Sequence, residues 1–198
     1  VITDPVTTTD ELIPSGETSS YRSNPLGLAE FTLSRKDPDY VPRAKEVQKA
    51  EKARVKGEDP AEALNEIADV TETVKKKFDV NTENTGIGST IFAVKPGDGS
   101  AREQAASCQK VLRGWANIAN EYATKRYRSN LINWGMLPFI YNGELPFENG
   151  DYIFIPDVVK GIEDKKSEFT AYVVSKGEMK EFTLNMGDLT DDERKIIL

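Results

Sequence analysis

The feature that most constrains the fold is an alternation of apolar runs and helical patterns that begins after Gly86. Thr90–Val94 (TIFAV) has the character of a short strand, Ser100–Arg113 has a helical pattern, and Ala116–Tyr122 is a second candidate strand. Strands that alternate with helices are typical of domains in which helices cover a sheet. The sequence therefore predicts a compact α/β domain.

The alternation continues toward the end of the chain. Phe169–Ser175 and Glu178–Leu184 flank Lys176-Gly177, which predicts a β-hairpin. The other expected elements are a helix over Arg128–Trp134, strands over Met136–Tyr141 and Tyr152–Ile155, and a last helix from Thr190.

The first 80 residues differ in kind from the rest. Residues 1–35 are rich in Thr, Ser, Pro and Gly, which predicts loop with short extended pieces. Residues 36–80 show helical spacing, and Asp59 followed by Pro60 is typical of a helix start. We expect a helical hairpin over 36–80, with its second helix ending near Phe78, inserted into the domain and packed on its side.

Composition excludes several classes of function. The chain has no histidine and one cysteine, Cys108, so it forms no internal disulfide, no Cys/His metal site and no histidine-based catalytic group. The net charge is −7, and the basic run Arg43–Lys56 is mixed with acidic residues, which disfavours nucleic-acid binding. No stretch has the length of a membrane span or the pattern of a signal peptide, so we expect a soluble, cytoplasmic protein.

The junction between the first strand and its helix is the best candidate for a binding site. Gly97-Asp98-Gly99 permits a tight turn and a close approach of backbone to a ligand, and Ser100 opens the helix. A helix N-terminus favours an anion, and Arg102 adds a guanidinium beside it. A purely structural interpretation stays open, because Ser100 and Glu103 have the spacing of a capping box.

The segment Gly97–Ala106 (GDGSAREQAA) resembles the G-[DE]-G-S-S-R-E-H-A signature of the aconitase family. This signature occurs in the aconitase C-terminal swivel domain and in the small subunit of isopropylmalate isomerase. The resemblance implies a three-layer β/β/α, barrel-like fold. It also implies that Ser100 is the catalytic base, that Arg102 binds a substrate carboxylate, and that Gly97 and Gly99 shape the loop between them.

Two further segments resemble the family in the same order along the chain. Thr9–Leu26 (TDELIPSGETSSYRSNPL) can be laid without gaps on T-D-H-I-S-x-A-G…F-R-G-H-L, which places Asp10 on the family aspartate and Arg22 on a second substrate-binding arginine. Arg128–Pro138 (RSNLINWGMLP) resembles E-T-N-L-x-x-x-G-L-L-P. The resemblance therefore covers most of the chain outside the helical hairpin.

Three positions depart from the family pattern. Ala101 stands where the family has a second serine that helps to bind substrate, and Gln104 and Glu11 replace two histidines. The resemblance thus implies a divergent branch that keeps the base and both arginines, with one hydrogen bond to the substrate lost.

The family reaction is a reversible dehydration and hydration of a hydroxy di- or tricarboxylate such as citrate or isocitrate, assisted by a [4Fe–4S] cluster. One cysteine cannot hold such a cluster, and Cys108 fits a small core residue. We therefore expect residues 1–198 to be one swivel domain of a longer hydro-lyase. Preceding domains of the same chain would bring the cluster, and the fragment alone would be inactive.

Two other hypotheses stay open on the sequence. The chain can be a separate small subunit that pairs in trans with a cluster-bearing large subunit. It can also be a non-catalytic binding module, like the RNA-binding form of some aconitases, although the acidic charge disfavours that role. The polar start at Val1, without a methionine, and the short last helix favour a piece of a longer protein.

Overall fold

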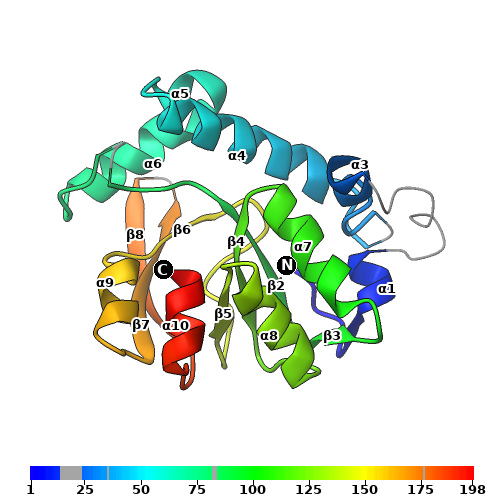
Figure 1. Ribbon diagram of the computed structural model, residues 1–198. Helices are drawn as coiled ribbons and strands as arrows, with labels where there is room; N and C mark the ends of the chain where they lie inside the picture. Colours follow the sequence, from blue (N-terminus) through cyan, green and yellow to red (C-terminus); the bar gives the residue numbers. More distant parts are fainter. Residues whose placement is uncertain (14–23, 35, 82–83, 176) are drawn as a thin grey trace.

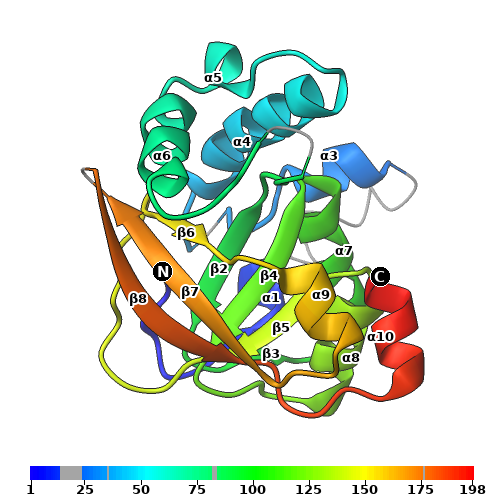
Figure 2. The same cartoon turned by 90° about the vertical axis from the view of Figure 1, so that its left-hand side faces the viewer.

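A mixed six-stranded sheet forms the centre of the molecule. The computed structural model describes residues 1–13, 24–34, 36–81, 84–175 and 177–198. Helices α7, α8, α9 and α10 lie on one side of the sheet, while α4, α5 and α6 form a separate layer across its top in both views (Figures 1 and 2).

The sheet has a parallel half and an antiparallel half. The parallel half contains β2 (Ser89–Ala93), β4 (Gly114–Ala119) and β5 (Leu137–Ile140). The antiparallel half contains β8 (Glu178–Asn185), β7 (Glu168–Ser175) and β6 (Tyr152–Phe154). Ile140 of β5 pairs with Asn185 of β8 and joins the two halves. The predicted α/β class is confirmed.

The strand order is β2-β4-β5-β8-β7-β6, which makes β2 and β6 the two edges. Among the described residues these edges are not paired with each other, so the sheet is open. The barrel-like closure that the family resemblance implies is therefore not confirmed.

Successive side chains of a strand point to opposite faces of the sheet. Successive residues of β2 and β4 are buried, so both faces are covered there, whereas β8 and much of β7 alternate between buried and exposed residues and leave one face of the antiparallel half largely exposed. In β2, Ile91 and Ala93 belong to one apolar cluster, together with residues of α7 and α8 such as Ala105 and Leu131. Phe92, which lies between them in the chain, belongs to a second cluster that includes residues of β4 and β5 and extends over the antiparallel half of the sheet.

Among the residues that the structure describes, four helices lie beside the sheet, and two of them begin at side-chain caps. The four helices are α7 (Arg102–Val111), α8 (Lys125–Asn133), α9 (Val158–Glu163) and α10 (Asp191–Ile197). Thr124 accepts a hydrogen bond from the backbone N–H of Tyr127 at the start of α8. Thr190 and Glu193 form a complete capping box on α10, and Arg128 of α8 lies 3.5 Å from Glu193. None of the helices in the described part of the chain is long and apolar enough to cross a membrane.

The prediction of loop over residues 1–35 is wrong in part. This region contains β1 (Thr7–Thr8), α1 (Thr9–Leu12) and α3 (Pro25–Ala29). Thr8 and Glu11 form a capping box on α1, and the side chains of Leu12 and Ile13 are fully buried. Because α1 has only one turn, its apolar residues show no helical period in the sequence.

The helical segment over 36–80 is confirmed as helical, but its second helix is divided. The three helices are α4 (Tyr40–Val55), α5 (Pro60–Ala63) and α6 (Glu66–Lys75). Asp59 caps α5 as predicted, since its carboxylate accepts from the backbone N–H of Ala61. Leu64 then adopts an extended conformation and separates α5 from α6. That this segment is an insertion stays a prediction.

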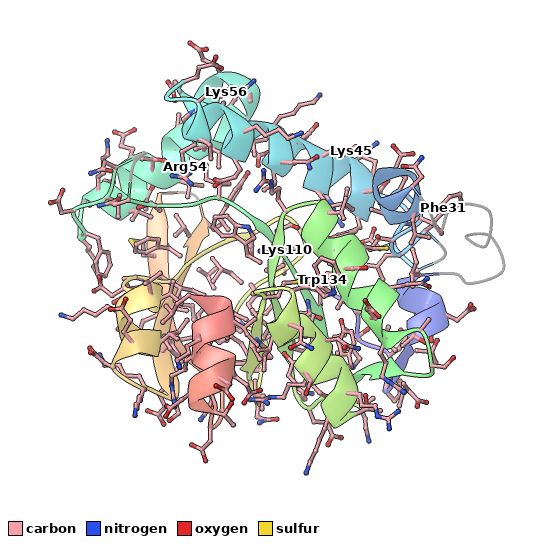
Figure 3. The ribbon with its side chains drawn as sticks, in the orientation of Figure 1. Phe31, Lys45, Arg54, Lys56, Lys110 and Trp134 are labelled. Atoms are coloured by element: carbon pink, nitrogen blue, oxygen red, sulfur yellow. The ribbon has the colours of Figure 1, made fainter. Side chains whose placement is uncertain are left out.

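Two of the contacts that attach the helical layer to the rest of the molecule are made by carboxylates. Lys45 of α4 donates to Glu30, just beyond α3, across 2.7 Å (Figure 3). Glu51 is 2% exposed, pairs with Arg54 at 2.6 Å and accepts a hydrogen bond from the backbone N–H of Ile87. The second attachment joins α4 to the segment that leads into β2.

Candidate functional site

The turn between β3 (Pro96–Asp98) and α7 depends on two glycines with positive φ. Gly97 has φ +100° and Gly99 has φ +130°, a region that residues with a Cβ rarely adopt. A Cβ at Gly97 would lie 2.3 Å from Cγ of Tyr127, and a Cβ at Gly99 would lie 2.2 Å from Oγ1 of Thr9. The turn is therefore held between α8 on one side and α1 on the other.

A closed ring of buried hydrogen bonds lies behind this turn. The Tyr127 hydroxyl donates to Oδ1 of Asn117 at 2.7 Å and accepts from Nε2 of Gln109 at 3.0 Å. Nδ2 of Asn117 donates to Oε1 of Gln109 at 2.6 Å, which completes the ring. The three residues come from α8, β4 and α7 and are at most 1% exposed. They fix the ring of Tyr127 against Gly97.

Ser100 is exposed at the end of this turn, and α7 begins two residues later. The N-cap position is occupied by Ala101, with φ −84° and ψ 40°, and no side chain caps the helix there. The capping-box interpretation of Ser100 and Glu103 is therefore wrong. Because Ser100 precedes the N-cap by one residue, its hydroxyl is not engaged by the first amides of α7.

Arg102 is the first residue of α7, and its guanidinium folds back over the turn. Its Nη1 donates a hydrogen bond to the backbone carbonyl of Gly99. A guanidinium carries five N–H groups, so this bond leaves most of the donor fork for another partner. The structure thus brings Ser100 and Arg102 to the same turn, at a helix end that carries partial positive charge.

The segment with Asp10 lies beside the same turn. β1 pairs in parallel with β3, with Thr7 opposite Pro96 and Thr8 opposite Asp98. Helix α1 then begins with Thr9, which contacts Gly99, and Asp10 is exposed in its first turn. The two sequence segments that resemble the aconitase family are therefore neighbours in space at this point.

Glu11, at a position where the family has a histidine, has a structural role in α1. Its carboxylate accepts from the backbone N–H of Thr8 and pairs with Nζ of Lys36 at 3.0 Å. Burial raises the pKa of this carboxyl, but the bonds to Lys36 and Thr8 outweigh burial and lower the pKa below its ordinary value. Glu11 therefore stays charged and anchors α1.

Arg22 lies outside the described residues, so its role stays a prediction. Cys108 is 1% exposed in α7, and burial, only partly offset by a hydrogen bond with Ser107, raises the pKa of its thiol to about 11. Among residues 1–13, 24–34, 36–81, 84–175 and 177–198, no three His, Cys, Asp or Glu side chains converge as metal ligands. The prediction that Cys108 is a small core residue is confirmed.

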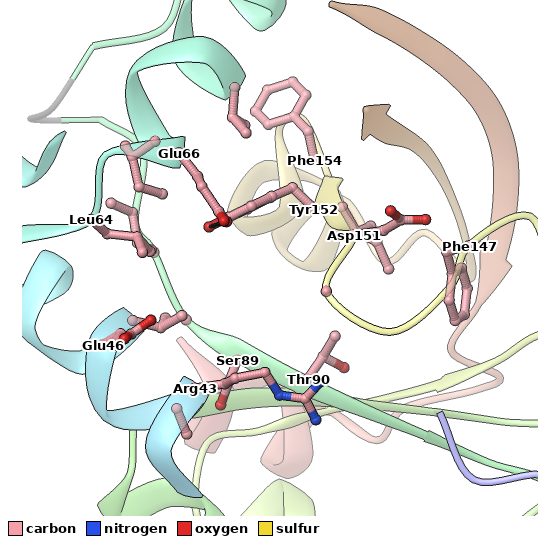
Figure 4. A pocket seen from close by; sticks show the side chains of 18 of the residues that line it. Arg43, Glu46, Leu64, Glu66, Ser89, Thr90, Phe147, Asp151, Tyr152 and Phe154 are labelled. Carbon is pink, nitrogen blue, oxygen red and sulfur yellow. Dashed lines mark hydrogen bonds between the residues drawn. The ribbon is translucent and has the colours of Figure 1, made fainter. Parts of the chain in front are cut away.

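A separate cavity lies elsewhere in the molecule, between α4, α6 and the strands β2 and β6 (Figure 4). Ser100, Arg102 and Asp10 do not line it. The lining residues come from positions 1–2, from the range 33–92, from Ile118 and from 147–154. These parts of the chain share no motif, so the cavity could not be predicted from the sequence. The support of Gly97 by Tyr127 was missed for the same reason.

Comparisons with known proteins agree with the motif resemblance. No family model matches the chain. Aconitate hydratase A of Rickettsia bellii (strain RML369-C) is 24% identical over 203 residues, which cover 94% of this chain and 23% of the relative. The chain thus spans about a quarter of the length of this curated relative. The resemblance to the aconitase family, predicted from three short segments, is confirmed along nearly the whole sequence.

A solved structure of similar size also matches. The crystal structure of a 3-isopropylmalate dehydratase from Methanocaldococcus jannaschii superimposes with a TM-score of 0.49 and 21% identity. The match covers 99% of this chain and 84% of that one.

Proposed function

We propose that this chain is the substrate-carboxylate-binding domain of an aconitase-type hydro-lyase. The proposed reaction is the reversible dehydration and hydration of a hydroxy di- or tricarboxylate. Support comes from the sequence similarity to aconitate hydratase A and from the geometry of the turn at Gly97–Arg102. The rest of the enzyme, whether in the same polypeptide or in a partner subunit, would complete the active site.

The observation that carries this proposal is the exposed turn that holds Ser100 and Arg102 together. Ser100 is the assigned base. A serine can act as a base only as the alkoxide, which needs nearby positive charge to be stabilised. The N-terminus of α7 and the Arg102 guanidinium both supply such charge. Tyr127 and Thr9 pack against Gly97 and Gly99 and so restrict the backbone that carries Ser100, which would favour proton removal from a carbon held in line.

The two arginines are assigned to the substrate carboxylates. Arg102 would bind one carboxylate with the N–H groups that do not contact Gly99, and Arg22 would bind a second. Asp10, on the exposed first turn of α1, is assigned to the same pocket. Ala101 supplies no hydroxyl where the family has a serine, so we expect one hydrogen bond fewer to the substrate.

The residues of this chain do not fit an iron–sulfur cluster. Such clusters are held by several cysteine thiolates, whereas Cys108 is buried with a raised pKa and is the sole cysteine of the sequence. We propose that other parts of the enzyme hold the [4Fe–4S] cluster that aconitase chemistry requires. The contribution of this chain is then to bind the carboxylates, to orient the substrate and to accept the proton at Oγ of Ser100.

The test is turnover by the full-length protein over a panel of hydroxy di- and tricarboxylates. We expect Ser100→Ala to lower kcat by about 10²–10⁴-fold. The KM for the substrate should change little, because the carboxylate contacts remain. Ser129→Ala, at an exposed serine of α8, is the matched control and should keep full activity. Full activity of Ser100→Ala would overturn the assignment of the base.

A further inference from the structure

The cavity between the helical layer and the sheet has the size and the lining of a small-molecule site. Its volume is about 430 Å³, within the range of ligand pockets in proteins. The walls are mostly aliphatic and aromatic and come from α4, α6, β2 and the segment that leads into β6. Six of these apolar lining residues are Val47, Ile67, Val74, Phe92, Phe147 and Phe154.

One end of the cavity carries a positive charge and hydroxyl groups. Arg43 of α4 extends along the floor toward Ser89 and Thr90 (Figure 4). The hydroxyl of the buried Tyr40 lies 3.4 Å from Oγ of Ser89. Burial raises the pKa of Tyr40 to about 12, while Ser89 and the nearby Arg43 act in the opposite direction. This end can donate several hydrogen bonds to a carboxylate.

Arg43 already has one partner, since its Nη2 donates to Oδ2 of Asp37 at 2.6 Å. The bond to Asp37 engages one nitrogen atom of the guanidinium and neutralises part of its charge. A ligand carboxylate would share the remaining donors with the hydroxyls of Tyr40 and Ser89. We therefore expect the attraction for an anion at this end to be moderate.

The opposite end carries the carboxylate of Glu66, and Glu46 of α4, one helical turn beyond Arg43, lies between the two ends (Figure 4). The hydroxyl of Tyr152 in β6 donates to Oε2 of Glu66 in α6 at 2.9 Å (Figure 4). Burial, the bond to Glu66 and the charge of Glu46 in α4 all raise the pKa of Tyr152, so the phenol stays neutral. Among the described residues, neither glutamate has a lysine or arginine partner within 4 Å. Both glutamates are exposed to solvent, and an ammonium group bound beside them would pair with their negative charge.

We infer that this cavity binds a small zwitterion with an apolar body, of the class of α-amino acids with an aromatic or aliphatic side chain. Its carboxylate would face Arg43, Tyr40 and Ser89, and its ammonium group would face Glu46 and Glu66. The apolar side chain would fill the space lined by Ile67, Val74 and Phe154. This site is separate from the turn at Ser100, and the inference does not rest on the proposed reaction.

The charges also exclude the proposed hydro-lyase substrates from this cavity. A di- or tricarboxylate would bring its additional negative charges toward Glu46 and Glu66, where like charges repel. A zwitterion would place a group of opposite charge at each end of the cavity. Arg43 is partly neutralised by Asp37, whereas no lysine or arginine among the described residues pairs with Glu46 or Glu66, so the ammonium group should contribute more to affinity than the carboxylate.

The experiment is isothermal titration calorimetry of the full-length protein with three ligands that share one phenyl body. L-phenylalanine carries both charges, 2-phenylethylamine carries only the ammonium group, and 3-phenylpropanoate carries only the carboxylate. We expect the affinity to fall in that order. Equal affinity for all three ligands, or no binding of any of them, would overturn the inference.

Substitutions in the cavity test which residue interacts with each charged group of the ligand. Glu66→Gln keeps an acceptor for Tyr152 but removes the negative charge. It should lower the affinity for the two amines about fivefold, as expected for a partly exposed ion pair. The affinity for 3-phenylpropanoate should not fall. Arg43→Gln should weaken only the two carboxylates. Lys45→Gln, on α4 but outside the cavity lining, is the control and should change nothing. The inference fails if Glu66→Gln leaves the binding of 2-phenylethylamine unchanged in a protein with the same melting temperature.

Discussion

Gly97 lies directly against the ring of Tyr127, so closely that a Cβ on Gly97 would come within 2.3 Å of Cγ of that ring. Gly97 begins the turn that presents Ser100, and the Tyr127 hydroxyl is fixed by Asn117 and Gln109. The position of the turn therefore depends on a buried polar ring that no substrate touches.

Tyr127→Phe tests the strength of this ring. The variant keeps the aromatic contact with Gly97 but leaves Nε2 of Gln109 and Oδ1 of Asn117 each with one partner fewer. Leaving buried polar groups less satisfied costs about 1–3 kcal/mol, so we expect the free energy of unfolding in urea to fall by that amount. Tyr141→Phe is the control, because its hydroxyl bonds the carbonyl of Glu144 at an exposed site. Equal effects of the two variants would contradict the importance of the ring.

Gly99→Ala tests the other side of the turn. Alanine at φ +130° is strained, and its Cβ would also meet Oγ1 of the buried Thr9. We expect a loss of about 1–3 kcal/mol in the free energy of unfolding, measured by urea denaturation. Gly143→Ala is a matched control, because Gly143 has φ +112° but no atom within 4 Å of its added Cβ. The difference in unfolding free energy between the two variants measures the cost of the clash between the added Cβ and Thr9. Adding Thr9→Ala to Gly99→Ala should therefore recover part of the lost stability.

Most strands and helices after Gly86 could be predicted, because those elements have their own apolar period. The short α9 and β3 were not predicted, since six and three residues are too few to show a period. The Gly97–Arg102 turn could also be located, because glycines next to a helix start constrain the backbone locally. The capping box could not be excluded from spacing alone, since the backbone angles at the helix start place Ala101, and not Ser100, at the N-cap. Local patterns therefore predict the elements, whereas the exact cap residue depends on backbone angles that the pattern does not determine.

The buried ring and the cavity could not be predicted for a different reason. Gln109, Asn117 and Tyr127 are polar residues that a sequence pattern places on a surface, and only the packing of α7, β4 and α8 brings them together inside. The cavity likewise depends on how α4 and α6 lie over the sheet. Such features depend on tertiary contacts between segments that carry no shared signal in the sequence.

Glu51→Ala tests how the helical layer is attached. Removing this 2% exposed carboxylate removes the ion pair with Arg54 and the hydrogen bond that the backbone N–H of Ile87 donates to Glu51. We expect the free energy of unfolding to fall by about 3 kcal/mol. Glu30→Ala removes the exposed pair with Lys45 and should cost at most about 1 kcal/mol. Both values come from urea denaturation, and a loss for Glu51→Ala no larger than for Glu30→Ala would refute the role of this attachment.

The buried thiol of Cys108 predicts how the free energy of unfolding depends on pH. Burial in α7, partly offset by Ser107, raises its pKa in the folded protein from 9.0 to about 11. Between these two values the unfolded chain releases the thiol proton while the folded chain keeps it. The contribution of Cys108 to the free energy of unfolding is therefore complete below pH 9 and is lost as the pH rises toward 11.

The measurement compares the original protein with Cys108→Ala by urea denaturation at several pH values from 8 to about 11. The variant lacks the ionisable group, so the difference in unfolding free energy between the two proteins should shrink as the pH rises. Tyrosines with raised pKa values titrate in both proteins and cancel from this difference. In the folded protein at pH 8, iodoacetamide should react with Cys108 far more slowly than in urea, since the thiolate is the reactive species. Rapid alkylation of the folded protein would show an accessible thiolate, and Cys108 would then have to be reconsidered as a reactive or ligating residue.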